Sequence, residues 1–143
     1  GVATVIWSYP RGEAITKDGE TAIDIAAYAA QIAALIGAHI IKIKLSTDHL
    51  MLPEAKKVYE DKKIDIATQA MRVEHCMQAA FNGRRIVVFS GGAAKGVDAV
   101  FDDARAIRDG GGNGSIIGRN SFQRSRKDAL EMLQKLVDIY KGA

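Results

Sequence analysis

Apolar and polar residues follow two periods along this chain of 143 residues. Short runs rich in valine and isoleucine, typical of buried strands, are each followed by a longer segment with apolar residues at helical spacing. Gly37 and Gly83 end two of the helical segments. The pattern predicts strands at residues 2–9, 39–45, 86–89 and 115–118 and helices at 22–36, 66–81, 97–108 and 126–140, with a further helix beginning near residues 53–57.

Strands that alternate strictly with helices predict an α/β fold with a parallel sheet and right-handed crossovers. Four βα units in a single domain, residues 1–143, can form an open doubly wound sheet or half of a TIM (β/α)8 barrel. Both architectures explain why distinctive polar residues end each strand. Only the barrel explains lysines on one strand face opposite an apolar face, because helices cover its outside. We therefore expect half of a barrel, and a start inside a strand without methionine indicates a fragment of the full one.

The run Ile40-Ile41-Lys42-Ile43-Lys44 places two lysines inside an otherwise apolar strand. Side chains two apart on a strand point the same way, so Lys42 and Lys44 share one face and Ile41 and Ile43 take the other. Two ammonium groups close together in a poorly hydrated place disfavour each other's charged form. A neutral lysine is a nucleophile for a carbonyl carbon. The alternative is a strand end whose lysines reach solvent or a carboxylate.

Two glycine-containing segments follow adjacent predicted strands. Ser90-Gly91-Gly92 follows one strand and Gly118-Arg119-Asn120 follows the next. Glycines let backbone N–H groups approach an anion closely, and loops after the last two strands of a TIM barrel are its usual phosphate site. We therefore predict a phosphate site, against the alternatives of a tight turn at the glycines and of an Arg119–carboxylate pair in the scaffold.

Composition and charge limit the classes of function. The net charge of +3 and the isoelectric point near 9.0 fit a protein that handles small anions but are too mild for nucleic acid. A single cysteine, Cys76, favours a reducing cytoplasmic compartment. No apolar run reaches the length of a membrane span. The three histidines lack metal-ligand spacing, so we expect no metal; they are His39, His49 and His75.

Together, the lysine strand, the glycine segments and the strand end Trp7-Ser8-Tyr9-Pro10-Arg11-Gly12 resemble a known family. The chain is similar to the C-terminal half of the class I fructose-bisphosphate aldolases of the archaeal and bacterial, DhnA-like type. The segment between Leu45 and Asn82 resembles the longer loop of the bacterial branch. The most specific matches lie at residues 7–12, 41–44, 84–93 and 110–123.

The resemblance implies a role for each candidate residue. Lys42 would be the Schiff-base lysine, with Lys44 as its positive neighbour; spacing alone does not choose between them. Tyr9 would transfer protons, and Trp7 would line the substrate pocket. Arg11 is a candidate for the far phosphate of the substrate. The phosphate on C1 of the ketose would be bound by Ser90, Gly91, Gly92, Gly118 and Arg119.

The implied reaction is the reversible cleavage of fructose 1,6-bisphosphate to dihydroxyacetone phosphate and glyceraldehyde 3-phosphate, without metal or other cofactor. Sugar phosphates would be the ligands, and the enzyme would be a homo-oligomer. Family members also use an acidic residue on the first barrel strand, which lies outside these residues, so the activity of the isolated chain is open. Two alternatives remain. One is a related Schiff-base aldolase, transaldol-type synthase or sugar-phosphate lyase of the same fold, and the other is a non-catalytic phosphate-binding half-barrel module.

Overall fold

Four parallel strands lie side by side in chain order in the computed structural model, which describes residues 1–142. The strands are β1 (Val5–Trp7), β2 (Ile40–Lys44), β3 (Ile86–Ser90) and β4 (Ser115–Ile116). They alternate with the helices α1 (Ile23–Leu35), α2 (Pro53–Asp61), α3 (Gln69–Ala79), α4 (Val97–Asp109) and α6 (Arg126–Lys141). The predicted α/β alternation and parallel sheet are confirmed.

The boundaries differ from prediction in a few places. β1 and β4 are shorter than the predicted strands, because each pairs with a neighbour over only a few residues. α3 begins at Gln69 rather than residue 66, because the Thr68 hydroxyl caps it by accepting a hydrogen bond from the Met71 N–H at 3.2 Å. Two short helical turns were not predicted: η1 (Gly19–Thr21) and α5 (Arg119–Phe122).

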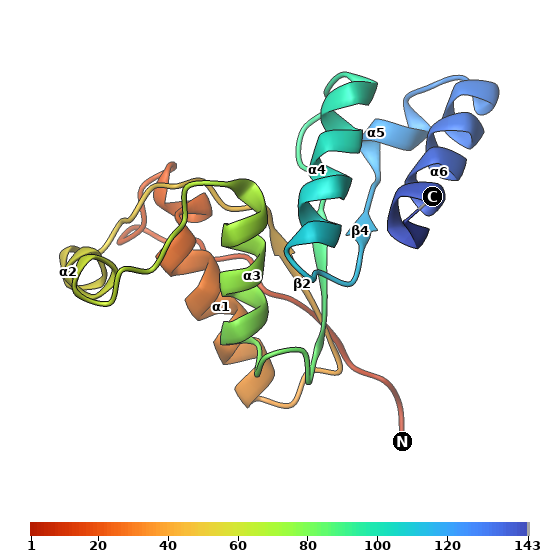
Figure 1. The fold of residues 1–143 in the computed structure, drawn as a ribbon. Coiled ribbons are helices and arrows are strands. Elements are labelled where there is room, and N and C mark those ends of the chain that lie inside the picture. Colours follow the sequence, from red (N-terminus) through yellow and green to blue (C-terminus); the bar gives the residue numbers. More distant parts are fainter. Residues whose placement is uncertain (143) are drawn as a thin grey trace.

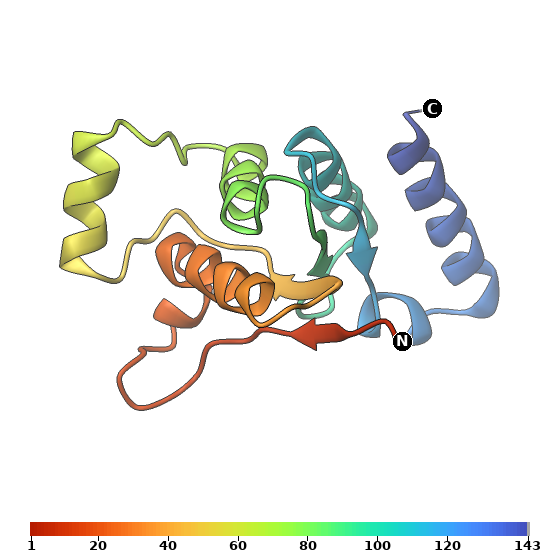
Figure 2. The same cartoon turned by 90° about the horizontal axis from the view of Figure 1, so that it is seen from below.

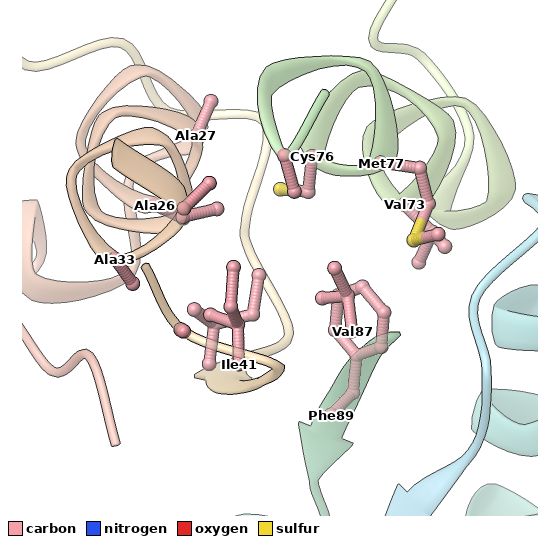
Figure 3. Close-up of a cluster of buried hydrophobic side chains, with 14 of the residues drawn as sticks. Ala26, Ala27, Ala33, Ile41, Val73, Cys76, Met77, Val87 and Phe89 are labelled. Carbon is pink, nitrogen blue, oxygen red and sulfur yellow. The ribbon is translucent and has the colours of Figure 1, made fainter. Parts of the chain in front are cut away.

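The main hydrophobic core lies between one face of the sheet and helices α1, α3 and α4. Figure 2 shows these helices together on one side of the strands. Ile41, Val87 and Phe89 point from the sheet toward Val73 and Cys76 of α3, as Figure 3 shows. Several alanines of α1 are buried against β2 and α3, so small side chains allow these elements to approach closely. The strand period of two thus directs β2 isoleucines into the core.

Within residues 1–142, helices α1, α3 and α4 leave the opposite face of the sheet uncovered (Figure 2). Side chains alternate along β3, where Val87 and Phe89 are buried while Ile86 is exposed. In β2 the isoleucines at 41 and 43 face the helices, so Lys42 and Lys44 lie on the uncovered face. The predicted division of this strand into an apolar and a lysine face is therefore confirmed. Parallel strands with helices on one side only are the arrangement of a barrel wall.

The segment between β2 and α3 extends away from the body of the molecule (Figure 1). It includes α2, which has no buried residue. Tyr59 links it to α3 through a hydrogen bond of 2.6 Å between its hydroxyl and His75 Nε2. Burial lowers the pKa of His75 and raises that of Tyr59. This contact fastens an otherwise exposed helix to the core.

No helix among residues 1–142 is both long and apolar enough to cross a membrane.

Candidate active site

Parallel register aligns the candidate residues in two rows across the uncovered face. Trp7 is level with Lys42, which is level with Val88 on β3. One step further toward the strand ends, Lys44 is level with Ser90. Because every strand runs in the same direction, the residues that follow them meet at one edge of the sheet. The sequence motifs at 7–12, 42–44 and 90–92 therefore come together.

Lys42 is buried among aromatic side chains although no helix covers its face. Only 7% of the residue is exposed. Its Nζ lies 3.6 Å from the centre of the Trp7 ring and 5.8 Å from that of Tyr9. The two rings are 6.3 Å apart. A cation–π contact of this kind is worth about 0.5–2 kcal/mol, so the aromatic pair fixes where the amine lies.

Trp7 is 65% exposed, so it is not a core aromatic residue. Its ring instead lies beside Lys42 and Tyr9 on the uncovered face, where the sequence predicted a pocket wall. Tyr9 follows β1, and backbone pairing continues to Ser8, whose N–H donates to the Lys42 carbonyl at 2.9 Å. This pairing holds Tyr9 beside the lysine strand.

Lys44 forms an ion pair that the sequence did not predict. Its Nζ donates to Oε2 of Glu20 at 2.8 Å, and both side chains are mostly shielded from solvent. This hydrogen bond is the main cause that lowers the pKa of Glu20, so the carboxylate is ionised. The Lys44 Nζ also lies 5.9 Å from the centre of the Tyr9 ring. Tyr9 therefore lies close to the side-chain nitrogens of both lysines.

A cavity of about 370 Å³ opens between the segments that follow β2 and β3. Lys44, Ser46 and Thr47 line one side, and the Ser90–Lys95 segment lines the other. Gly92 has a φ of +67°, a left-handed conformation that favours glycine and turns the backbone around the cavity. Lys95 also lines the cavity and is ion-paired with Asp103 of α4. Hydroxyls, backbone groups, the Lys44 ammonium and the Lys95–Asp103 ion pair thus line a space large enough for a phosphate group.

Asn120 holds the Ser90 segment in place and was not assigned a role from the sequence. Only 3% of the residue is exposed. Its Nδ2 donates to the carbonyls of Gly91 and Ala93 at 3.3 and 3.0 Å, and its Oδ1 accepts from the Lys95 N–H at 2.8 Å. A buried asparagine with three backbone partners at long sequence separation leaves no periodic signal in the sequence.

Arg119 joins the two glycine segments, although it is exposed and does not line this cavity. Its Nη2 donates to the Gly92 carbonyl at 3.0 Å, so its partner is a backbone oxygen rather than a carboxylate. Gly118 caps α5 directly before it. Arg11 is exposed and does not line this cavity. It also does not line a second, apolar pocket beside β1, which includes Ile6 and Tyr28. The structure therefore gathers Trp7, Tyr9, Lys42, Lys44, Ser90, Gly91 and Gly92, with Gly118 and Arg119 at the margin and Arg11 apart.

The arrangement combines a shielded lysine amine and a phenol on the uncovered face of the sheet with a cavity at the ends of β2 and β3. Among the described residues, no three His, Cys, Asp or Glu side chains converge as a metal site would require. The groups present can supply a nucleophile, a proton donor and anion contacts. Fold and site together define half of a TIM barrel with a buried lysine on the inner face of one strand.

Comparison with known proteins identifies the family. Residues 1–124 match the description "DeoC/LacD family aldolase", and the chain belongs to this family. It is 31% identical over 154 residues to "Probable fructose-bisphosphate aldolase class 1" of Chlamydia muridarum, covering 98% of this chain and 43% of that protein. It is 32% identical over 139 residues to "Fructose-bisphosphate aldolase class 1" of Thermoproteus tenax, covering 96% and 43%.

A solved structure shows the same relation. It is an archaeal fructose-1,6-bisphosphate aldolase with the catalytic lysine covalently bound to the carbinolamine intermediate of the substrate. It superposes with a TM-score of 0.73 at 27% identity, covering 97% of this chain and 45% of that one. The chain thus spans less than half the length of the relatives it matches, and the predicted half of a TIM barrel is confirmed.

Proposed function

We propose that this chain carries the Schiff-base lysine and a phosphate site of a class I aldolase that cleaves fructose 1,6-bisphosphate reversibly. The observation that supports the proposal most is the position of Lys42. It is shielded between Trp7 and Tyr9 on the inner face of the sheet, in register with the strand that leads into the Ser90 cavity. The relatives described above carry this activity in their names. Because the chain covers 43% of them, the activity is proposed for the whole protein.

The reaction begins with attack of the neutral Lys42 amine on the ketone carbon of the substrate. The carbinolamine then loses water, with its hydroxyl protonated as it leaves, and an iminium forms on Nζ. The iminium accepts the electron pair of the C3–C4 bond as that bond breaks and the C4 hydroxyl loses its proton. Glyceraldehyde 3-phosphate departs, leaving an enamine. Protonation of the enamine carbon and addition of water then release dihydroxyacetone phosphate and restore the amine.

Tyr9 is the proposed proton carrier, because its ring lies near the side-chain nitrogens of both lysines, at 5.8 Å from that of Lys42 and 5.9 Å from that of Lys44. A positioned acid–base group of this kind contributes roughly 10²–10⁴ in rate. Lys44 and the Ser90–Gly92 segment would hold the C1 phosphate, with Arg119 bracing Gly92 from outside the cavity. Arg11 remains a proposal for the far phosphate. The iminium serves as the electron sink, so the proposed chemistry requires no metal.

The decisive experiment is borohydride reduction of the full-length protein in the presence of dihydroxyacetone phosphate, followed by tryptic peptide mapping. A reduced adduct on Lys42 blocks cleavage there, so the label should appear in a peptide spanning residues 18–44. An adduct on Lys44 would leave the Lys42 cleavage intact and label residues 43–56. Label at 43–56 alone would overturn the Lys42 assignment, and no label would exclude the Schiff-base mechanism.

A substrate panel then separates the related reactions. Cleavage of fructose 1,6-bisphosphate supports the aldolase, whereas trapping without cleavage of this sugar would indicate a related synthase or lyase. Binding of sugar phosphate with neither an adduct nor cleavage would indicate a phosphate-binding module.

A further inference from the structure

Glu20 occupies a fixed position above the lysine strand, although it belongs to the connection between β1 and α1. The turn η1 that carries it is closed by a hydrogen bond of 3.1 Å from the Glu20 N–H to the Thr16 carbonyl. The preceding residue, Gly19, is packed so closely that a Cβ there would collide with the Met51 side chain. A larger residue at position 19 would have to displace the Met51 side chain, so the turn before Glu20 is closely packed.

Backbone hydrogen bonds also tie η1 to the segment that follows β2. The Thr47 N–H donates to the Thr21 carbonyl at 2.8 Å, and the Ile23 N–H donates to the His49 carbonyl at 2.9 Å. Ala22 and Thr47 form an isolated parallel bridge. Glu20 is therefore held relative to the end of β2, which is where Lys44 lies. This fixed position allows the Glu20 carboxylate to orient the Lys44 ammonium.

The surroundings of Lys44 contain one near carboxylate. Glu20 Oε2 accepts from its Nζ at 2.8 Å, while the other lysine that contacts Glu20 is Lys17, at 3.4 Å and 87% exposed. Asp103 also lines the cavity but is paired with Lys95. The ammonium of Lys44 has three N–H donors, so the bond to Glu20 leaves others for a ligand in the cavity.

We infer that Glu20 is a positioning residue of the proposed reaction: it holds the Lys44 ammonium and balances its charge, which favours the iminium on Lys42. The charges of the three groups explain this effect. With a neutral Lys42 amine, Lys44 and Glu20 sum to zero, and the iminium raises the total to +1. Without the carboxylate, the iminium would form beside an unbalanced ammonium two residues away on the same strand face, where like charges repel. This inference rests on the proposed function.

The test uses borohydride trapping with unphosphorylated dihydroxyacetone, a probe without phosphate charge. In the full-length protein, Glu20→Gln should reduce the trapped fraction at Lys42 by roughly tenfold at equal probe concentration. The double variant Glu20→Gln/Lys44→Met should trap more than Glu20→Gln alone, because removing the ammonium restores the charge balance. Glu13→Gln, which alters an exposed glutamate of the same connection, is the matched control and should trap like the unaltered protein.

The rescue distinguishes charge balance from a structural role, since a damaged turn would not be repaired by a second substitution in β2. Trapping in Glu20→Gln equal to the unaltered protein, or no rescue in the double variant, would overturn the inference alone. If Glu20→Gln fails to fold, Glu20→Asp carries the test: it keeps the charge and should trap more than half as well as the unaltered protein, and a tenfold loss would overturn the inference. Absence of any adduct on Lys42 in the unaltered protein would overturn the proposed function and the inference with it.

Discussion

Replacement of Asn120 by alanine should lower the folding stability of the protein and its proposed affinity for phosphate. The side chain is buried and makes three hydrogen bonds to the backbone of residues 91–95. A typical hydrogen bond contributes about 1 kcal/mol net, so the three together are worth about 3 kcal/mol. That loss lowers the melting temperature of a domain of 150–250 residues by about 6–12 °C, and that of a longer protein by less. The Ser90–Lys95 segment, which lines the cavity, would also lose the side-chain contacts that hold it in place.

The matching assay measures thermal unfolding and ligand affinity of the full-length protein in parallel. We expect Asn120→Ala to bind dihydroxyacetone phosphate roughly tenfold more weakly, while the affinity for dihydroxyacetone changes little. Asn120→Asp keeps the shape but places a carboxylate against the Gly91 and Ala93 carbonyls, so it should be at least as damaging. Ser121→Ala is the control, because that hydroxyl bonds only within its own turn. An equal effect of Asn120→Ala on both ligands, or a stability loss under about 1 kcal/mol, would refute the reasoning.

Four further outcomes are expected. Arg119→Ala removes the hydrogen bond that braces Gly92, so it should weaken dihydroxyacetone phosphate by about tenfold and dihydroxyacetone less; equal weakening in titration calorimetry would contradict a phosphate site at Gly92. Activity of the full-length protein should survive EDTA, and a loss restored by zinc would contradict the Schiff-base class. Because burial lowers the pKa of His75, the unfolded chain takes up its proton first, so the unfolding free energy in urea should fall as the pH drops through about 6.5; His75→Gln should flatten this slope. Residues 1–143 alone should associate in sedimentation velocity, because both outer strands have an unpaired edge. Their turnover of fructose 1,6-bisphosphate should be about 10²–10⁴ slower than that of the full-length protein. A fully active monomer would contradict both expectations.

The parts of the site that lie on strands were predictable from the sequence, because the strand period determines which face each side chain takes. The opposed faces at Ile41 and Lys42 followed from this period alone. The resemblance placed Tyr9 and Trp7 in the same pocket, and the structure brings both rings to Lys42.

The residues that connect segments were not predictable in this way. Glu20 meets Lys44 across 24 positions, and Asn120 reaches Lys95 across 25. Both lie in the short helical turns η1 and α5, which contain too few residues for a periodic pattern to predict which way a side chain points. The alternative of a lysine paired with a carboxylate, left open from the sequence, is realised at Lys44 rather than at the proposed nucleophile.

One face of β2 packs in the core and the other carries the proposed nucleophile. Because both faces are used, insertions and deletions within this strand are restricted. Loss of one codon within the strand would exchange the two faces, bringing lysines against α1 and α3 and isoleucines into the reaction space. Such a deletion would remove both the folding stability and the proposed catalytic activity. Insertions and deletions should be tolerated better at α2, which has no buried residue. We expect related sequences to differ in length there while keeping the spacing within β2 invariant.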